Sequence, residues 1–215
     1  MSTRRLLYKL NRPRKDNETS QTPSQEAIDE LFPLKIERDL QLKLLERKHA
    51  PELFKLVDSN RTHLRRWLPF VDDYRSVSAA NQFIRRNRES HAGKTRVLMG
   101  IWSGESLAGV ITYDYIDWSN RAVLIGFWLG KSFEGRGIVT RACSTLTDLA
   151  INGLGMNRVE IFCAYENTRC RSVPERLEFK QEGVSRQRER IREHFVDTVS
   201  YSMLASEWKT GLSDA

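Results

Sequence analysis

Residues 121–141 read RAVLIGFWLGKSFEGRGIVTR, and this stretch decides the fold of the chain. Its first part, from Ala122 to Leu129, is almost continuously apolar, which predicts a strand that is covered on both faces. Gly135 and Gly137 follow and indicate a tight turn, because glycine adopts backbone conformations that other residues avoid. Apolar residues then recur at spacings of three and four, which predicts a helix directly after the turn.

A strand, a glycine turn and a helix in this order form a place for an anion. The N–H groups of the first helical turn have no acceptor within the helix, and the positive end of the helix dipole points the same way. The same pattern also occurs in α/β proteins that bind nothing at this position. These residues alone therefore leave both interpretations open.

A second strand is predicted at residues 158–163, where Val159, Ile161 and Cys163 alternate with the other residues. It must run parallel to the strand at 121–129, because a helix crosses between them. Two parallel strands divided by a glycine turn leave a crevice for a ligand.

The remaining segments predict a single sheet with helices around it. Alternating residues favour strands near 34–36, 40–44, 96–102 and 107–117, and the last of these forms an antiparallel meander with 96–102 and 121–129. Helical spacing appears near 50–56 and 62–67, and a third helix is expected after Ser76 or Ser78 through Ile84. One closing strand is expected near residues 201–208. The fold class is therefore α/β, or α+β, with one mixed sheet.

Residues 125–142 also carry a family resemblance. IGFWL followed by FEGRGIVTRA resembles the coenzyme A loop of the GNAT acetyltransferase superfamily, in particular its RimJ/RimL-type branch, which acetylates protein N-termini, notably of ribosomal proteins. The superfamily pattern Q/R-x-x-G-x-G/A falls on Glu134, Gly137 and Val139. Only the glycine keeps the superfamily residue.

Residues 166–183, ENTRCRSVPERLEFKQEG, resemble the second signature of the branch, N-x-R-S-x-x-V-P-E-R-L-G-F-x-x-E-G. Cys170 replaces the usual serine and Glu178 replaces a glycine. A helix that ends at Glu178 favours a left-handed residue, and a residue other than glycine is strained there by about 1 kcal/mol.

The resemblance spans roughly residues 32–208 and implies a strongly twisted mixed sheet with a splayed parallel pair of strands and flanking helices. It implies acetyl-CoA as co-substrate, with no metal. The residues expected to contact it occupy the matching positions: Phe127, Trp128, Leu129, Glu134, Gly135, Arg136, Gly137, Ile138, Val139, Thr140, Asn167 and Cys170.

Transfer of an acetyl group from a thioester to an amine needs a polarised carbonyl and a proton for the departing thiolate. The resemblance implies that a main-chain N–H of Trp128 or Leu129 polarises the carbonyl. Cys170, at the serine position, is the expected proton donor, and Cys163 is its rival. The alternative interpretation of each cysteine is a small buried hydrophobic residue without a chemical role.

The group that accepts the proton of the amine is left open. Branch members often carry a glutamate just before the I-G-Y-W-L segment, where this chain has Leu124. Asp114, Asp117 and Glu160 are candidates because their strands border the crevice, and a chain of water molecules would also serve. An α-amino group has a pKa of about 7.7 to 8, so a fair fraction is neutral without a strong base. The histidines have no spacing that predicts a metal site or a Cys-His pair.

The family resemblance implies that the first predicted helices form one wall of the cleft for the acceptor substrate. Trp67 and Phe70 are therefore expected either to contact the substrate or to lie in the core. The arginines of the third predicted helix are expected either to contact the substrate or to be solvated: Arg85, Arg86 and Arg88.

Length and composition favour one domain of residues 32–208, a basic tail of residues 1–31 and a short tail of residues 209–215. The net charge of +7 and the pI near 9.5 favour polyanionic partners, and the basic tail is expected either to touch the ribosome or to be a solvated extension. Three cysteines and no apolar run long enough for a bilayer predict a cytoplasmic protein with reduced thiols and no membrane partner.

Together with the resemblance, the sequence therefore predicts an N-acetyltransferase that acts on a protein N-terminus of the ribosomal-protein type. A small amine or an aminoglycoside is the alternative acceptor. Two alternatives are not enzymes: a degenerate domain that binds acyl-CoA without turnover, and an RNA-binding module. The oligomeric state is left open, with a homodimer among the alternatives.

Overall fold

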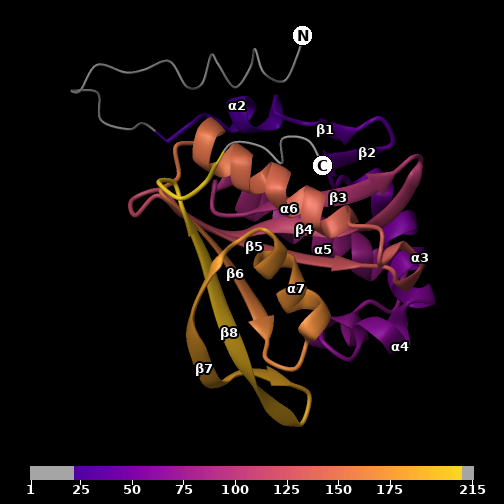
Figure 1. The fold of residues 1–215 in the computed structure, drawn as a ribbon. Coiled ribbons are helices and arrows are strands. Elements are labelled where there is room, and N and C mark those ends of the chain that lie inside the picture. Colours follow the sequence, from indigo (N-terminus) through magenta and orange to yellow (C-terminus); the bar gives the residue numbers. More distant parts are fainter. Residues whose placement is uncertain (1–21, 210–215) are drawn as a thin grey trace.

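Figure 1 shows the fold, a computed structural model that describes residues 22–209. Within these residues, one sheet of eight strands has the order β1-β2-β3-β4-β5-β6-β8-β7. Only β5 and β6 are parallel, and the other neighbouring pairs are antiparallel. This confirms the predicted mixed sheet. The strands are β1 (Leu34–Glu37), β2 (Leu40–Leu44), β3 (Val97–Ser103), β4 (Ser106–Asp117), β5 (Ala122–Leu129), β6 (Arg158–Ala164), β7 (Lys180–Ile191) and β8 (His194–Leu204).

Helices cover both faces of the sheet. On the first face, α6 (Ile138–Asp148), α7 (Thr168–Arg176) and the short α2 (Gln25–Asp29) enclose one hydrophobic core. On the second face, α3 (Ala50–Ser59) and α5 (Val77–Ala92) enclose another. The names first face and second face are used in this sense below. Figure 1 shows α6 crossing the sheet while β7 and β8 extend beyond it as a hairpin.

The shorter helical segments connect these elements. α4 (Arg61–Leu64) follows α3, and the single turns η1 (Arg47–His49), η2 (Pro69–Asp73) and η3 (Lys131–Phe133) lie in the loops. A wider turn, η4 (Leu149–Gly153), ends α6. Ser76 caps α5, as expected, because its hydroxyl accepts a hydrogen bond from the N–H of Ala79 at 3.2 Å.

The fold begins before the boundary expected at Phe32. In α2 and the turn after it, Ile28 and Leu31 are 2% and 4% exposed and belong to the first-face core. The helix is a single turn with few apolar residues, so its mostly polar sequence does not distinguish it from the predicted N-terminal tail. Residues 1–21 and 210–215, which hold the rest of the two expected tails, lie outside the described residues.

β5 is not covered on both faces, contrary to the prediction. Val123 and Ile125 are buried on the first face, but residues 126–129 are only half-buried. The reason is that the second-face helices pack on the neighbouring strands, α5 on β3 and α3 on β4. The apolar run therefore includes residues that border an open space.

β7 is an edge strand that the sequence pattern does not indicate. Nearly all its side chains are exposed, so the strand has no alternation of apolar and polar residues. Charged side chains and the irregular register after Ser185 discourage another chain from pairing with this edge. The single closing strand expected near 201–208 is thus part of a long hairpin, β7 with β8.

Candidate active site

The parallel strands separate at one point, and this opening is the centre of the site. β5 and β6 pair only as far as Ile125 and Ile161. Beyond these residues β5 stays beside β4 up to Leu129, while β6 stays beside β8 up to Ala164. The predicted splayed pair is therefore present, and it leaves the edge of β5 open.

The register shows which main-chain groups face this opening. Gly130 donates its N–H to the carbonyl of Ala108 on the β4 side at 2.9 Å, and the carbonyl of Gly126 accepts a hydrogen bond from the Thr112 hydroxyl at 3.2 Å. Because main-chain groups alternate in direction along a strand, the main-chain N–H and C=O of Trp128 also point toward β4. The main-chain N–H and C=O of Phe127 and Leu129 then point toward the opening. Of the two predicted carbonyl polarisers, only Leu129 has its N–H in this direction.

The loop after β5 presents a row of free amide groups. Gly135 and Gly137 have φ angles of 74° and 68°, in the left-handed region that favours glycine. Gly137 is the N-cap of α6 and supplies no side-chain acceptor. Among the described residues, no hydrogen-bond acceptor is found for the N–H groups from Gly135 to Thr140. These amides and the positive end of α6 suit an anion such as a diphosphate.

A cavity of about 730 Å³ joins this loop to the opening between the strands. Its walls come from β5, the loop, α6, α7 and the segment that includes α4. All the residues expected to contact acetyl-CoA line the cavity except Arg136, whose guanidinium lies 5.8 Å from the ring centre of Phe133.

Several cavity residues are missed by sequence reasoning. On α7 these are Arg169, Ser172, Val173 and Arg176, whose spacing of three and four places them on one helix face. This spacing is readable in the second signature and is a usable signal. His63, on α4, also lines the cavity, but nothing in the sequence connects α4 with the loop.

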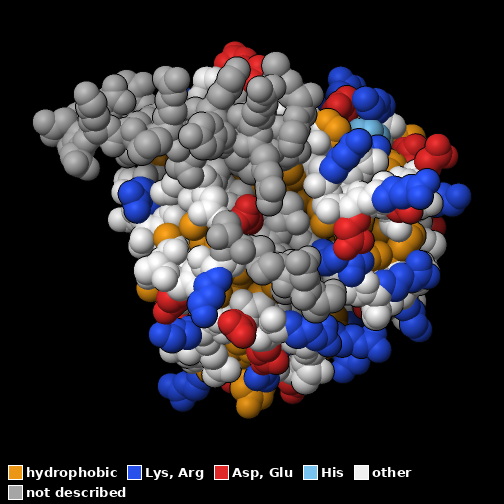
Figure 2. Space-filling model, turned by 45° about the horizontal axis from the view of Figure 1, so that its top comes forward, with side chains coloured by type: hydrophobic (Ala, Val, Ile, Leu, Met, Phe, Trp, Pro, Cys, Tyr) orange, Lys and Arg blue, Asp and Glu red, His pale blue; other side chains and the backbone are white. Residues whose placement is uncertain are grey.

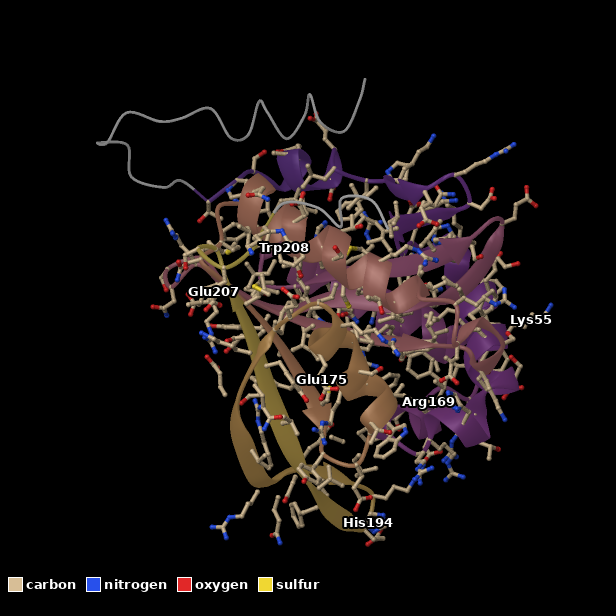
Figure 3. The ribbon with its side chains drawn as sticks, in the orientation of Figure 1. Lys55, Arg169, Glu175, His194, Glu207 and Trp208 are labelled. Atoms are coloured by element: carbon tan, nitrogen blue, oxygen red, sulfur yellow. The ribbon has the colours of Figure 1, made fainter. Side chains whose placement is uncertain are left out.

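Glu134 lies where the superfamily pattern has glutamine or arginine, and two basic side chains contact its carboxylate. His63 Nε2 lies 3.0 Å from its Oε1, and Arg169 Nη1 pairs with its Oε2. Figure 3 shows Arg169 on the side of α7 that faces α4. The bridge thus joins α4, the loop and α7 at the cavity, and it balances a negative charge beside the anion site.

The cysteines differ in their access to the cavity. Cys170 is half-buried and lines it, and the N–H of Cys170 donates to the Asn167 side chain at 3.1 Å. Cys163 is 2% exposed, belongs to the first-face core and does not line the cavity. A hydrogen bond to the Cys170 sulfur, together with burial, raises the pKa of the Cys163 thiol. Cys170 is therefore the better placed of the two predicted proton donors.

The three candidate carboxylates have different surroundings. Asp117 caps the turn after β4, and hydrogen bonds from the Ser119 hydroxyl and from Asn120 lower its pKa to about 2. It is occupied in holding the turn. Glu160 accepts two contacts from Arg158, at 2.8 and 2.9 Å.

Asp114 pairs with Arg96 through Oδ1, its one ion pair within residues 22–209. It lies on the second face beside β5, at a bulge in the pairing between β4 and β5.

The expected acceptor wall is only partly present. Trp67 lines the cavity together with α4. Phe70 instead packs in an aromatic cluster, with ring centres 5.6 Å from Tyr74 and 6.3 Å from Phe83. It is partly buried and packs against the second-face core, where the side chains of α5 and η2 meet. Among the described residues, the arginines of α5 do not line the cavity.

Two other classes of site are tested by the structure. Within residues 22–209, no group of three or more His, Cys, Asp or Glu side chains is placed to hold a metal ion. None of the helices in this range is both long enough and apolar enough to cross a bilayer. Figure 2 shows Lys and Arg side chains spread over one face with acidic side chains among them.

The cavity fits an extended thioester with a diphosphate. The free amides from Gly135 to Thr140 are donors for phosphate oxygens, and the open edge of β5 offers main-chain groups to the amides of a pantetheine arm. The half-buried Cys170 lies at the same cavity.

Comparison with known proteins agrees with this geometry. Residues 39–180 match a family model described as acetyltransferase (GNAT) domain. The chain is 35% identical over 180 residues to the putative ribosomal N-acetyltransferase YdaF of Bacillus subtilis (strain 168), covering 83% of this chain and 98% of that protein.

Solved structures share the fold, among them the following two. The microcin C7 self immunity acetyltransferase MccE, in complex with acetyl-CoA and AMP, has a TM-score of 0.77 and 26% identity, over 87% of this chain and 99% of that one. The ribosomal L7/L12 alpha-N-protein acetyltransferase RimL, in complex with coenzyme A, has a TM-score of 0.76 and 27% identity, over 80% of this chain and 97% of that one. With the splayed strands, the free amide loop and the matched family model, this chain belongs to the GNAT family of acetyl-CoA-dependent N-acetyltransferases.

Proposed function

We propose that this acetyltransferase modifies the N-terminal α-amino group of a protein, of the ribosomal-protein type. The observation that carries the proposal is a single cavity that runs from the free amides at Gly135 to Thr140, past the open edge of β5, to α4 on the other side of the opening. The names of YdaF and RimL support this class of acceptor.

Different residues of the chain bind acetyl-CoA and assist the transfer of its acetyl group. Acetyl-CoA supplies an acetyl group activated as a thioester. The amides from Gly135 to Thr140 hold the diphosphate, and Phe127 offers its main chain to the pantetheine arm. The N–H of Leu129 polarises the thioester carbonyl, and the Cys170 thiol gives a proton to the departing sulfur and regains one from solvent.

A small amine is the second candidate acceptor. MccE, whose structure contains AMP beside acetyl-CoA, has nearly the same TM-score as RimL. An aminoglycoside belongs to the same alternative. Contact with the ribosome through the basic tail and formation of a homodimer stay predictions. A cytoplasmic location is also proposed, since the cysteines of the described residues are unpaired thiols.

The cofactor part of the proposal is tested with Gly137→Glu. The new side chain places a carboxylate in the anion site, and the left-handed φ of 68° adds strain of about 1–2 kcal/mol. Gly104→Glu is the matched control, because Gly104 has a φ of 59°, lies in the turn between β3 and β4 and has no atoms within 4 Å of an added Cβ. Isothermal titration with CoA should show wild-type affinity for Gly104→Glu and a loss of about 100-fold or more for Gly137→Glu. Equal affinities in the two variants would refute the position of the anion site.

The acceptor part is tested by release of free CoA from acetyl-CoA. Decapeptides with free Ser, Ala or Met N-termini, the same peptides with a blocked N-terminus and one internal lysine, and an aminoglycoside serve as acceptors. We expect turnover with the free N-termini only. Turnover with the aminoglycoside alone would establish the second candidate, and transfer to the internal lysine at an equal rate would contradict specificity for chain ends.

A further inference from the structure

We infer that Asp114 supplies the carboxylate that binds the acceptor amine and takes up its proton. This inference rests on the proposed function and assigns the acceptor side of the same site. The chain lacks an acid at Leu124, on β5, and the structure places an acid from the adjacent strand on the same face.

The first step of the argument is the position of the Asp114 carboxylate. A Cβ added to Gly126 would lie 2.0 Å from Asp114 Oδ2 and 3.0 Å from Thr112 Oγ1. The carboxylate therefore lies against the main chain of β5, in space that exists because Gly126 has no side chain. Gly126 is the first residue of β5 after the last pair with β6. Asp114 thus stands where the two strands begin to separate.

The second step is the unused oxygen. Asp114 Oδ1 pairs with Arg96, whereas Oδ2 has no hydrogen-bond donor among the described residues. About a third of the side chain is exposed, 32%. Asp114 does not itself line the cavity, but Gly126, against which its carboxylate lies, directly precedes the lining residue Phe127. A carboxylate oxygen with free acceptor capacity on a partly open face is suited to an ammonium or to the water that carries its proton away.

The third step is the direction of approach. The anion site, α6 and α7 lie on the first face, and the acetyl donor enters from there. An amine that attacks the thioester through the opening arrives from the second face. Asp114 and Leu124 belong to this face, because Gly126 and Trp128 alternate with the first-face residues Val123 and Ile125. An acid on the first face would be behind the donor.

Glu160 is another acid of this face near the opening, and it makes a useful control. It pairs with Leu124 across the parallel strands, one strand away from Asp114. Both arginine contacts given above end on its Oε1, and its residue is half-buried. The pairing register places it before the strands separate, so it lies farther from the open edge of β5.

The experiment compares four variants with a peptide acceptor that the wild-type enzyme acetylates. Asp114→Asn should lower kcat/KM for the peptide about 100-fold, the lower end of the range for a lost general base, while the Kd for CoA changes less than twofold. Arg96→Gln removes the same ion pair but keeps the carboxylate, and it should lose less than about fivefold. Glu160→Gln should stay near the wild type. Leu124→Glu in the Asp114→Asn background should recover at least tenfold of the lost activity.

The pH profile adds a readout that a purely structural ion pair would not move. If Asp114 takes up the amine proton, the deficit of Asp114→Asn should shrink as pH rises above about 8, where α-amino groups are already neutral. Equal losses for Asp114→Asn and Arg96→Gln at every pH, an unchanged Asp114→Asn, or no recovery by Leu124→Glu would each overturn the inference. A wild-type enzyme that binds CoA and acetylates none of the peptides would instead refute the proposed acceptor class.

Discussion

Replacing Glu178 by glycine should stabilise the protein without changing its activity. Glu178 follows α7 and has a φ of 60°, in the left-handed region. Its N–H donates to Glu175 at 3.2 Å, and the N–H of Phe179 donates to Pro174 at 3.0 Å, which is the Schellman arrangement at a helix end. Glycine normally occupies this position. The Glu178 side chain is exposed and makes no hydrogen bond or ion pair within the described residues.

Two opposing contributions set the size of the effect. Relief of the left-handed conformation is worth about 1–2 kcal/mol for a residue other than glycine. A new glycine costs about 0.4–1 kcal/mol, because the unfolded chain gains conformational freedom. The strain is larger, so Glu178→Gly should raise the free energy of unfolding by about 0.5–1 kcal/mol. For a chain of this size the melting temperature should rise by about 1–4 °C.

Urea unfolding followed by circular dichroism measures the difference directly, and CoA titration serves as the functional check. Gly155→Ala is the reverse control, since Gly155 has a φ of 70° and an added Cβ meets nothing within 4 Å. It should destabilise the protein by a similar amount. A lower stability for Glu178→Gly, or shifts of the same sign in both variants, would refute the strain argument. The Kd for CoA should remain within twofold, because α7 keeps its cavity residues in place.

Three further predictions concern stability and thiol access. Hydrogen bonds from Arg158 and a serine lower the pKa of Glu182 to about 2 from 4.5. This carboxylate therefore stabilises the fold above pH 4.5 and loses that effect as pH falls toward 2. Because the side chain is exposed, Glu182→Gln should lower the free energy of unfolding by only about 0.5–1 kcal/mol at pH 7 and should not change it near pH 2, and equal urea midpoints at pH 7 would contradict this. Tyr113 is 1% exposed, and its hydroxyl donates a hydrogen bond to a main-chain carbonyl at 2.6 Å. Tyr113→Phe should therefore lower the free energy of unfolding by about 1–2 kcal/mol. An unchanged urea midpoint would show that this hydrogen bond contributes nothing to stability. Burial raises the pKa of the Cys143 thiol, so iodoacetamide should modify Cys170 first in the native protein, and CoA should slow that reaction; mass spectrometry that finds Cys143 modified at the same rate would argue against the assigned burial.

Several parts of the site follow from local sequence alone. The turn at Gly135 and Gly137 and the start of α6 are set by glycine conformation and helix capping, which involve neighbouring residues only. The cap at Ser76 and the strained residue at Glu178 are local in the same sense. The parallel course of β6 follows from the helix that must cross between two strands.

Register and long-range packing decided the rest. Whether Trp128 or Leu129 turns its N–H to the opening depends on the pairing of β5 with β4, which the sequence of β5 does not contain. Cys163 lies in the core behind Cys170 because α7 folds back over β6. Phe70 packs against the second-face core because α5 and η2 meet there.

The sequence by itself determined the anion loop, since its free amides come from a run of adjacent residues with their own backbone preferences. Only the tertiary structure brought His63 and Arg169 to Glu134, and the Asp114 carboxylate to Gly126. Each of these contacts joins residues on different elements, so its energy depends on how the sheet and helices pack. Local backbone preference carries no information about such distances.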